Sequence, residues 1–254
     1  MADPDPSVVV RAARPWTPTV LALLRHFAQV GFDGAPRPAG DGRTPDGREA
    51  VEYVPGTSPH PRDWSDDAFA PIGQLLRRMH DATATFVPPP TAQWQPWFGR
   101  DLPGGRLAIG HCDAAPWNIV RTADDRFVLI DWEYAGPVDA VTDLAYAAWL
   151  NAQLHDDDVA ERLGLPPALE RAAQLRLILD GYGLSTRDRD GFVDRMIELA
   201  VHAARADAVE YGVSEASTAA VAPDGYPVLW GITWRARSAS WLLRHRAMLE
   251  RAIG

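Results

Sequence analysis

Residues 111–136 have the sequence HCDAAPWNIVRTADDRFVLIDWEYAG, and this stretch decides the fold that we predict. Asn118 follows Asp113 by five positions, and Asp131 follows Asn118 by thirteen, at the end of an apolar run. Mg²⁺ prefers oxygen ligands, and phosphoryl transfer needs a carboxylate that can take the proton of an attacking hydroxyl. Three oxygen-bearing side chains at this spacing therefore indicate a site for phosphoryl transfer.

The composition of the 254-residue chain argues against several classes of function. A formal net charge of −9 argues against a nucleic-acid partner and favours a small cationic substrate, although acidity also serves solubility alone. All 25 basic residues are arginine, so no lysine can act as a nucleophile or phosphate ligand. We find neither a signal peptide nor an apolar run of about eighteen residues, and the single cysteine, Cys112, cannot form an internal disulfide. We therefore expect a cytoplasmic protein with no membrane partner.

The periodicity of apolar residues predicts an α+β protein with two lobes. Strands at 7–11 and 49–54 and a helix at 17–30 are expected to form a small N-terminal lobe over residues 1–55. Pro55-Gly56 ends this lobe as a turn, and residues 56–254 are expected to be mostly helical. In that larger lobe we expect helices at 65–83, 140–151, 168–182, 191–211 and 227–252, and short strands at 106–109, 118–120 and 127–131.

The chain contains ten tryptophans, which is many for its length. In the last predicted helix Trp230, Trp234, Trp241 and His245 recur at positions that lie near one face. We interpret this stripe as part of the core rather than as a cofactor site.

The stretch at 111–136 resembles the aminoglycoside phosphotransferase and choline kinase group, relatives of protein kinases, whose pattern is roughly H-G-D-x-x-x-x-N followed by I-D-[FW]-[DE]. The segments RPWTPTVLALLRHFAQVGFDGAPRPAG, EYVPG, LLRRMHDA and DLAYAAW also resemble this group in order, so the resemblance covers most of the chain. It implies a bilobal protein-kinase-like fold and a phosphotransferase that uses Mg²⁺ and ATP or GTP.

The resemblance implies a role for each polar residue of the two motifs. Asp113 would accept or orient the proton of the substrate hydroxyl, while Asn118 and Asp131 would bind Mg²⁺. Glu133 lies two positions beyond Asp131, so in an extended segment both side chains would point to the same side. Glu133 would then touch a metal ion or a cationic substrate group, with a structural hydrogen bond as the alternative.

Neighbouring residues are interpreted as structural. His111 and Asp143 are expected to support the backbone of the Asp113 loop. Cys112 stands where the family often has glycine, and we expect it to be a small buried side chain. Trp117 and Trp132 are expected to pack against the protein, with stacking on a ligand as the alternative.

The nucleotide side of the site departs from the family pattern. Arg11 aligns with the lysine that holds the α- and β-phosphates, and the backbone of Glu52, Tyr53 and Val54 would contact adenine. The predicted helix at 17–30 contains no acidic residue, so the glutamate that usually pairs with that lysine is missing. Ten residues precede Arg11, too few for the usual hairpin that covers the phosphates. The sequence therefore predicts a shortened N-lobe.

Two classes of function fit these residues. The first is a small-molecule kinase that moves the γ-phosphate of ATP or GTP to a hydroxyl of a cationic acceptor. Aminoglycosides are the leading class of acceptor, and choline or ethanolamine is the alternative. The acidic run at 156–158, with Glu161, would help to bind a polycation, or else it is a solvated helix start. The second class is a catalytically degenerate, nucleotide-binding pseudokinase. A further alternative is a homodimer in which a second subunit supplies the missing strands.

Overall fold

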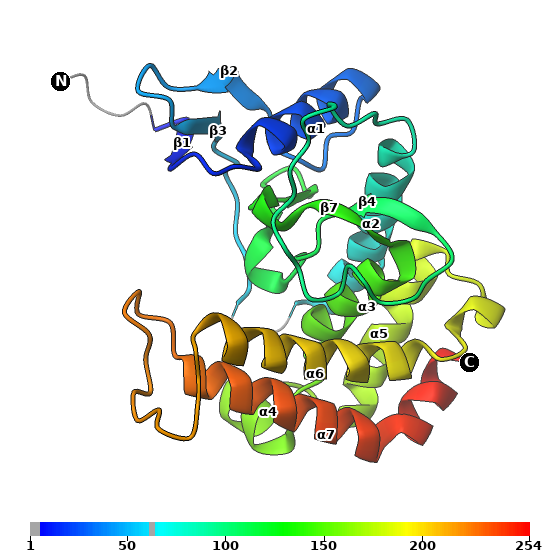
Figure 1. Cartoon of the computed structure of the whole chain (residues 1–254). Helices are drawn as coiled ribbons and strands as arrows, with labels where there is room; N and C mark the ends of the chain where they lie inside the picture. The colour runs from blue at the N-terminus through cyan, green and yellow to red at the C-terminus, as the bar shows by residue number, and fades with distance from the viewer. Residues whose placement is uncertain (1–5, 61–63) are drawn as a thin grey trace.

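The structure, a computed structural model, describes residues 6–60 and 64–254, so residues 1–5 of the predicted N-terminal lobe lie outside it. A small sheet and one helix form the part of the molecule at the top of Figure 1, and a larger, mostly helical part lies below them. This arrangement confirms the predicted α+β fold.

The upper sheet has three strands in the order β1-β3-β2, formed by Val8–Arg11, Glu49–Glu52 and Pro38–Arg43. Both β1 and β2 run antiparallel to β3, and Arg11 pairs with Glu49 across the ladder. The prediction missed β2, because its sequence PAGDGR has low strand propensity and its pairing is irregular. Within the described residues β1 is an edge of this sheet.

Helix α1, Thr17–Val30, begins and ends where we predicted. Pro18 occupies the first turn, where a missing N–H costs no helical hydrogen bond, and Gly31 ends the helix with a φ of 76°. Beyond the helix, the carbonyl oxygen of Gly34 accepts a 2.9 Å hydrogen bond from the backbone N–H of Leu129. This bond ties the upper part of the molecule to the strands below it.

Two short antiparallel pairs of strands hold the stretch at 111–136. Strand β5, Ile119–Arg121, pairs with β6, Phe127–Leu129, and β4, Leu107–Gly110, pairs with β7, Gly136–Asp139. We predicted β4, β5 and β6 to within two residues but missed β7. The loop that contains Asp113 therefore runs from β4 to β5, between two ladders.

The larger part of the molecule is built from six α-helices in the described residues, of which five were predicted. They are α2, Phe69–Thr83; α3, Ala140–Asn151; α4, Asp157–Leu163; α5, Ala168–Tyr182; α6, Phe192–Glu210; and α7, Val228–Ile253. Single 3₁₀ turns occur at Asp66–Ala68, Pro116–Asn118, Trp132–Tyr134 and Thr186–Arg189. The unpredicted helix is α4.

Helices α2 and α5 approach each other at glycines. A Cβ atom on Gly73 would lie 2.0 Å from the carbonyl oxygen of Ile178, and one on Gly181 would lie 2.1 Å from that of Ala70. Neither position has room for a side chain, so both glycines are required for this close packing.

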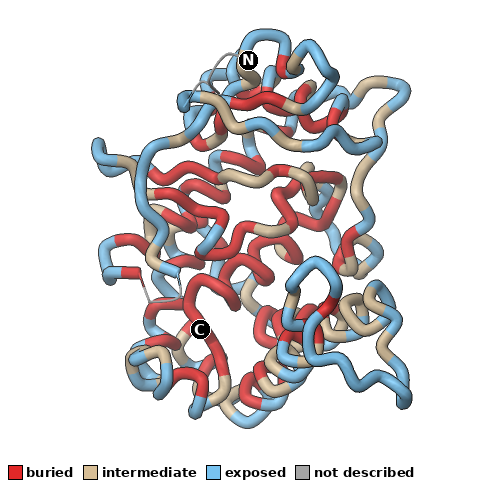
Figure 2. The backbone as a smooth tube through the Cα atoms, turned by 90° about the vertical axis from the view of Figure 1, so that its left-hand side faces the viewer, coloured by how far each residue is buried: buried red, intermediate tan, exposed pale blue. Residues whose placement is uncertain are grey.

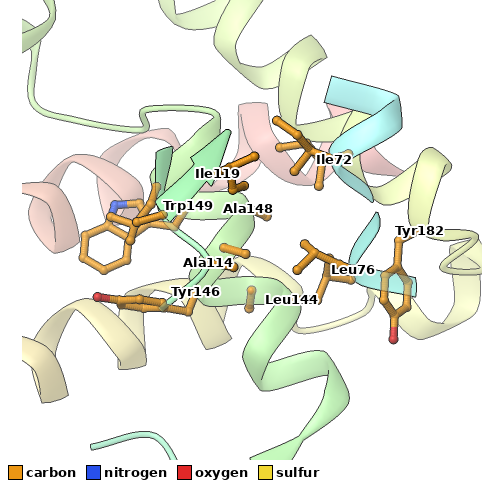
Figure 3. Packing of buried hydrophobic residues seen from close by; sticks show 14 of the residues in the cluster. Ile72, Leu76, Ala114, Ile119, Leu144, Tyr146, Ala148, Trp149 and Tyr182 are labelled. Atoms are coloured by element: carbon orange, nitrogen blue, oxygen red, sulfur yellow. The ribbon is translucent and has the colours of Figure 1, made fainter. Parts of the chain in front are cut away.

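The core lies where α2, α3 and α5 meet the Asp113 loop. Figure 2 shows the buried segments in the interior of the molecule, and in Figure 3 Ile72 and Leu76 of α2 gather with Leu144 of α3. Ala114 and Ile119, on either side of the loop's 3₁₀ turn, belong to the same cluster. The core thus anchors the loop directly beside each of its polar residues, Asp113 and Asn118. Within residues 6–60 and 64–254, no helix combines the length and the apolar character that crossing a bilayer requires.

The tryptophan stripe of α7 is core only along part of its length. Trp241 is fully buried, and Trp234 stacks on Trp149 with 5.7 Å between the ring centroids. Trp230, in the first turn of α7, is 41% exposed. The packing prediction therefore holds for the middle of the helix and is wrong for its beginning.

Candidate active site

Asp113 and Asn118 lie together on the loop between β4 and β5. Pro116 starts the 3₁₀ turn Pro116–Asn118, which brings the two side chains to the same side of the loop. The Asn118 amide nitrogen donates to the backbone oxygen of Asp113 at 3.0 Å and to its Oδ2 at 2.8 Å. Both bonds use the amide nitrogen of Asn118, so its amide oxygen is the side-chain atom that can bind a cation.

His111 links the Asp113 loop to the segment that contains Asp131. Its Nε2 bonds to the carbonyl oxygen of Ile130 at 2.9 Å, and its Nδ1 accepts the backbone N–H of Asp113 at 3.3 Å. Burial lowers the pKa of His111, against the opposing charge of Asp143. A neutral imidazole has one donor and one acceptor, as these two bonds require. These two bonds are consistent with the supporting role expected of His111, which stays a prediction.

Asp143 is a buried carboxylate at the centre of the loop's support. It accepts the backbone N–H of Cys112 at 2.7 Å and that of His111 at 3.3 Å, and its Oδ2 lies 2.9 Å from Nε2 of His80. His80 is in turn bonded to the hydroxyl of Tyr182 at 2.9 Å. Burial alone would raise the pKa of Asp143, but the bond and charge of His80 outweigh it and lower the pKa.

Replacing Asp143 with asparagine is expected to lower the free energy of unfolding by about 2 kcal/mol, because the backbone N–H groups of His111 and Cys112 and the ring of His80 lose a charged, buried hydrogen-bond acceptor. Urea unfolding measures this change, with Asp81→Asn as the control, since Asp81 forms only exposed ion pairs with Arg77 and Arg106. The lowered pKa means that the stabilisation is present above the ordinary value of 3.8 and is lost as the pH falls below it. Equal stability of the two variants at pH 7 would contradict this account of Asp143.

Cys112 has a left-handed backbone conformation, with a φ of 63°. This conformation explains why glycine often occurs at the position in the family. The side chain is fully buried, as predicted, and its sulfur lies 3.7 Å from Nη1 of Arg100. Burial raises the pKa of the Cys112 thiol, so the group stays protonated and unreactive.

Cys112→Val is expected to destabilise the fold by about 2 kcal/mol, because a β-branched residue is strained at this φ. Cys112→Gly relieves the backbone but loses the packing of the sulfur, so its stability is expected to stay within about 1 kcal/mol of the native value. Thermal unfolding of Cys112→Val and Cys112→Gly tests both expectations. If valine is tolerated as well as glycine, the backbone at Cys112 is not a constraint.

Arg100 is a supporting residue that the sequence did not reveal. Its guanidinium group donates to backbone oxygens of Gln95 at 2.9 Å, Tyr134 at 2.7 Å and Pro137 at 3.1 Å. It therefore fixes the chain just beyond Asp131. No local motif marks Arg100, because all but one of these contacts are distant in sequence.

Asp131 and Arg11 meet although 120 positions separate them. Asp131 follows β6 with a φ of 63°, which turns its side chain away from the ladder, and its carboxylate pairs with the guanidinium of Arg11 at the end of β1. Asp131 thus takes the place of the missing helix glutamate as the partner of Arg11. The predicted strand at 127–131 ends at Leu129 because of this left-handed turn.

The geometric argument for Glu133 was wrong. Residues Trp132–Tyr134 form a 3₁₀ turn rather than an extended segment. Burial raises the pKa of Glu133, and the charge of Asp131 adds to this rise, so the two carboxylates still influence each other. Trp132 is buried and donates to the carbonyl oxygen of Leu129 at 2.8 Å, which confirms that it packs rather than stacks on a ligand.

Carboxyl groups crowd this site. Burial raises the pKa of Asp113 to about 8; the charge of Asp131 adds most to the rise and that of Glu133 less, while Arg235 opposes it. Converging oxygen donors of like charge fit a hard divalent cation such as Mg²⁺. In the described parts of the chain, no group of three or more His, Cys, Asp or Glu side chains is placed to hold a metal ion. The pair of Asn118 and Asp131 stays a prediction.

The predicted adenine-contacting segment directly follows β3. The strand expected at 49–54 ends at Glu52, whose N–H bonds to the carbonyl oxygen of Arg37 at 2.8 Å, and the N–H of Tyr53 bonds to that of Ser7 at 2.7 Å. Glu52, Tyr53 and Val54 line a cavity of about 440 Å³ that also contains Phe32 and Arg126. No described residue lines both this cavity and the one beside Asp113.

A cavity of about 500 Å³ opens beside Asp113, and we call it the Asp113 cavity. Its walls include Trp97, Phe98, Trp117, Tyr134, Tyr146, Asp207, Glu210, Tyr211, Tyr226 and Arg235. Arg235 donates to Asp207 at 2.7 Å and to the hydroxyl of Tyr226 at 2.8 Å, which itself donates to Asp207 at 2.7 Å. This closed set of bonds fixes one wall of the cavity. This wall could not be predicted from the sequence, because α6 and α7 carry no recognisable motif.

The acidic residues at 156–158 form ion pairs and hydrogen bonds within the protein. Asp156 pairs with Arg237 at 2.9 Å and Arg244 at 2.8 Å, Asp158 pairs with Arg237, and Asp157 accepts the indole N–H of Trp241 at 2.7 Å. These carboxylates hold α4 against α7. The expectation that they bind a polycation is therefore not supported, and the helix-start alternative holds.

Comparisons with known proteins concern the family and the fold of this chain. A model of the phosphotransferase enzyme family matches residues 90–192. A trifolitoxin immunity protein of Rhizobium leguminosarum bv. trifolii is 52% identical over 246 residues, an alignment that covers 97% of this chain and 92% of that protein.

Two solved structures have a similar fold. An amicoumacin kinase in complex with AMP-PNP, Ca²⁺ and its ligand aligns with a TM-score of 0.64 and 14% identity, over 96% of this chain and 80% of that one. A choline/ethanolamine kinase family protein from Mesorhizobium loti aligns with a TM-score of 0.58 and 16% identity, over 96% of this chain and 86% of that one. At these identities the likeness concerns the fold alone.

Proposed function

Because this chain belongs to the phosphotransferase enzyme family, we propose that it is a small-molecule kinase that moves the γ-phosphate of ATP or GTP to a hydroxyl of a toxin or antibiotic in the cytoplasm. One observation carries the proposal. Asp113, Asn118 and Asp131 gather at one site, and β1 brings Arg11 to the same place. An anionic donor and a hydroxyl acceptor need this combination of groups.

Each residue has a distinct part in the proposed reaction. Asp113 lines the Asp113 cavity, so it orients the acceptor hydroxyl and takes its proton. Arg11 binds phosphate oxygens through its forked guanidinium, and the backbone of residues 52–54 holds the base. Asn118 and Asp131 hold a divalent cation, which would neutralise charge on the transferring phosphoryl group. Glu133 adds negative charge beside them.

The Asp113 cavity favours an acceptor with an ammonium group. Its walls carry the carboxyl group of Glu210 as well as those of Asp113 and Asp207, of which Asp207 is paired with Arg235. Tyrosine and tryptophan rings around them suit a cation as well. The immunity function named for the relative suggests that modification of such an acceptor protects the cell.

The proposal is tested by incubating the protein with Mg²⁺–ATP and one candidate acceptor at a time: trifolitoxin, amicoumacin, an aminoglycoside, choline or ethanolamine. Mass spectrometry is expected to detect an acceptor that gains one phosphoryl group with the native protein and not with Asp131→Asn. Protection of a trifolitoxin-sensitive strain by the native protein, and equally by Asp131→Asn, would refute phosphorylation as the basis of immunity.

A second candidate is binding of a nucleotide or toxin without turnover. The ion pair between Arg11 and Asp131 favours it, because that pair satisfies the charges that a nucleotide and its cation would use. Strand β1 is an edge of its sheet within the described residues. This position also favours binding without turnover, since no described strand lies beyond β1 to cover the phosphates of a bound nucleotide. Tight binding of a toxin without any phosphorylated product would select this candidate.

A further inference from the structure

We infer that the acceptor has two parts, and that an uncharged aromatic or apolar part of it binds in a second cavity beside the Asp113 cavity. This inference rests on the proposed function and narrows its substrate class. We call the second cavity the tryptophan pocket, and it is lined mainly by Trp117, Leu150, Val159, Leu163, Trp230 and Trp234.

The tryptophan pocket is formed by elements far apart in the sequence. It has a volume of about 460 Å³, and its walls come from the Asp113 loop, the end of α3, α4 and the first turns of α7. In Figure 1 α4 and α7 lie together at the bottom of the molecule, and their ion pairs hold them there. A volume of this size fits a ring system rather than a single ion or water.

Two tryptophans are left exposed at this pocket. Trp117 is 39% exposed and Trp230 is 41% exposed, whereas every other tryptophan of the chain is buried or partly buried. Single exposed apolar residues are common, but two on one cavity, with Trp234 beside them, form a continuous apolar surface. Such a surface is typical of a ligand site. A ligand site here also explains why the tryptophan stripe is exposed at the N-terminal end of α7.

The charges around the pocket argue against a cation. Arg162 lies over the ring of Trp230 at 5.3 Å, and Arg235 lies over that of Trp234 at 5.5 Å, so a guanidinium group already lies against each of these rings and would repel a cation. The described residues of the wall include no carboxylate. His155 in the same wall is neutral, because burial, with the charge of Arg171, lowers its pKa to about 3. An uncharged aromatic or apolar group therefore suits this pocket best.

The tryptophan pocket and the Asp113 cavity are neighbours. Trp117, Tyr226 and Arg235 line both of them. The bonds among Arg235, Tyr226 and Asp207 fix this common wall, and Trp117 lies on the same loop as Asp113. A molecule whose hydroxyl and ammonium groups occupy the Asp113 cavity can thus extend past Trp117 into the pocket. The Asp113 cavity takes the polar part of this molecule, and the tryptophan pocket takes its ring.

Binding of a graded series of probes to the whole protein tests this inference. The probes are 1-amino-ω-phenylalkan-2-ols of increasing spacer length, with ethanolamine as the member that lacks a ring. Calorimetry with Mg²⁺–AMP-PNP present is expected to give a dissociation constant lower by about tenfold or more for the best ring-bearing probe, because a buried phenyl ring removes apolar surface from water. Trp230→Ala is expected to abolish this difference. Leu163→Trp, which fills the pocket from the opposite wall, is expected to reduce it.

Leu243→Ala is the matched control, because Leu243 is on the same helix, is 54% exposed and does not line the pocket. Its preference for ring-bearing probes is expected to equal that of the native protein. If all probes bind equally, or if Trp230→Ala and Leu163→Trp keep the full preference, the inference is overturned even when phosphate transfer is observed. If the preference depends on Trp230 but no probe or toxin is phosphorylated, the pocket stands and the proposed kinase activity fails.

Discussion

Replacement of Asp131 with asparagine is expected to lower the rate of phosphate transfer by about a thousandfold or more. The substitution removes the carboxylate that pairs with Arg11 and that we propose to bind the cation. Phosphoryl transfer depends mainly on positioning and charge neutralisation, so this loss affects the chemical step itself. Steady-state kinetics with the best acceptor measures the effect.

The fold is expected to tolerate this change. Asparagine adopts the left-handed conformation that Asp131 has, with a φ of 63°, more readily than most residues do. Asp125→Asn is a close control, because Asp125 has a φ of 64° and a carboxylate 2.5 Å from Nε of Arg121, but lies in the exposed turn between β5 and β6. Full activity is expected for Asp125→Asn. Comparable losses in both variants would mean that any disturbance of this hairpin, rather than the charge of Asp131, abolishes transfer.

Asp113→Asn is expected to slow transfer by about a hundredfold to ten-thousandfold and also to stabilise the metal-free protein. Asparagine cannot take a proton from the acceptor, although its oxygen still accepts the hydrogen bond of Asn118. The carboxyl group of Asp113 has an ordinary pKa of 3.8, and burial raises this pKa to about 8 in the folded protein. Between these two pH values the chain therefore binds a proton when it folds. The free energy of unfolding of the native protein therefore falls as the pH rises through this window.

The gain in stability of Asp113→Asn should consequently grow with pH. It is expected to be small near pH 4 and to reach the order of a few kcal/mol near pH 8, as measured by urea unfolding with a chelator present. Asp125→Asn again serves as the control and should show no such trend, because its carboxylate is exposed. A variant that loses activity and stability together would show that Asp113 is a structural residue and not the proton acceptor.

The parts of the fold that sequence predicted well have local causes. Helix α1 has an apolar stripe and Pro18 in its first turn, and α3 begins at Asp139, whose side chain accepts the N–H of Thr142. Such signals lie within a few positions of the element that they define. The strand Pro38–Arg43 has none, because its conformation depends on pairing with β3. The short helix Asp157–Leu163 is held by arginines of α7 and has little apolar periodicity of its own.

The site divides in the same way. The motif residues Asp113, Asn118 and Asp131 were predicted from their spacing, whereas the pairing of Arg11 with Asp131 was not, because 120 positions separate the two residues. The left-handed conformation of Asp131 could not be predicted, because only Gly is a clear signal for it. Arg100 and Arg235 were missed for another reason: each acts through contacts with residues distant in the chain.

We propose that this chain transfers phosphate from a nucleotide to an acceptor hydroxyl at Asp113 and Asp131. Transfer of label from ATP labelled in its γ-phosphate to an acceptor that binds the protein tests it most directly. The native protein is expected to place the label on the acceptor hydroxyl, whereas Asp113→Asn and Asp131→Asn bind the acceptor and leave it unlabelled. A native protein that binds Mg²⁺–ATP and the acceptor together, yet leaves the acceptor without label, would contradict the claim.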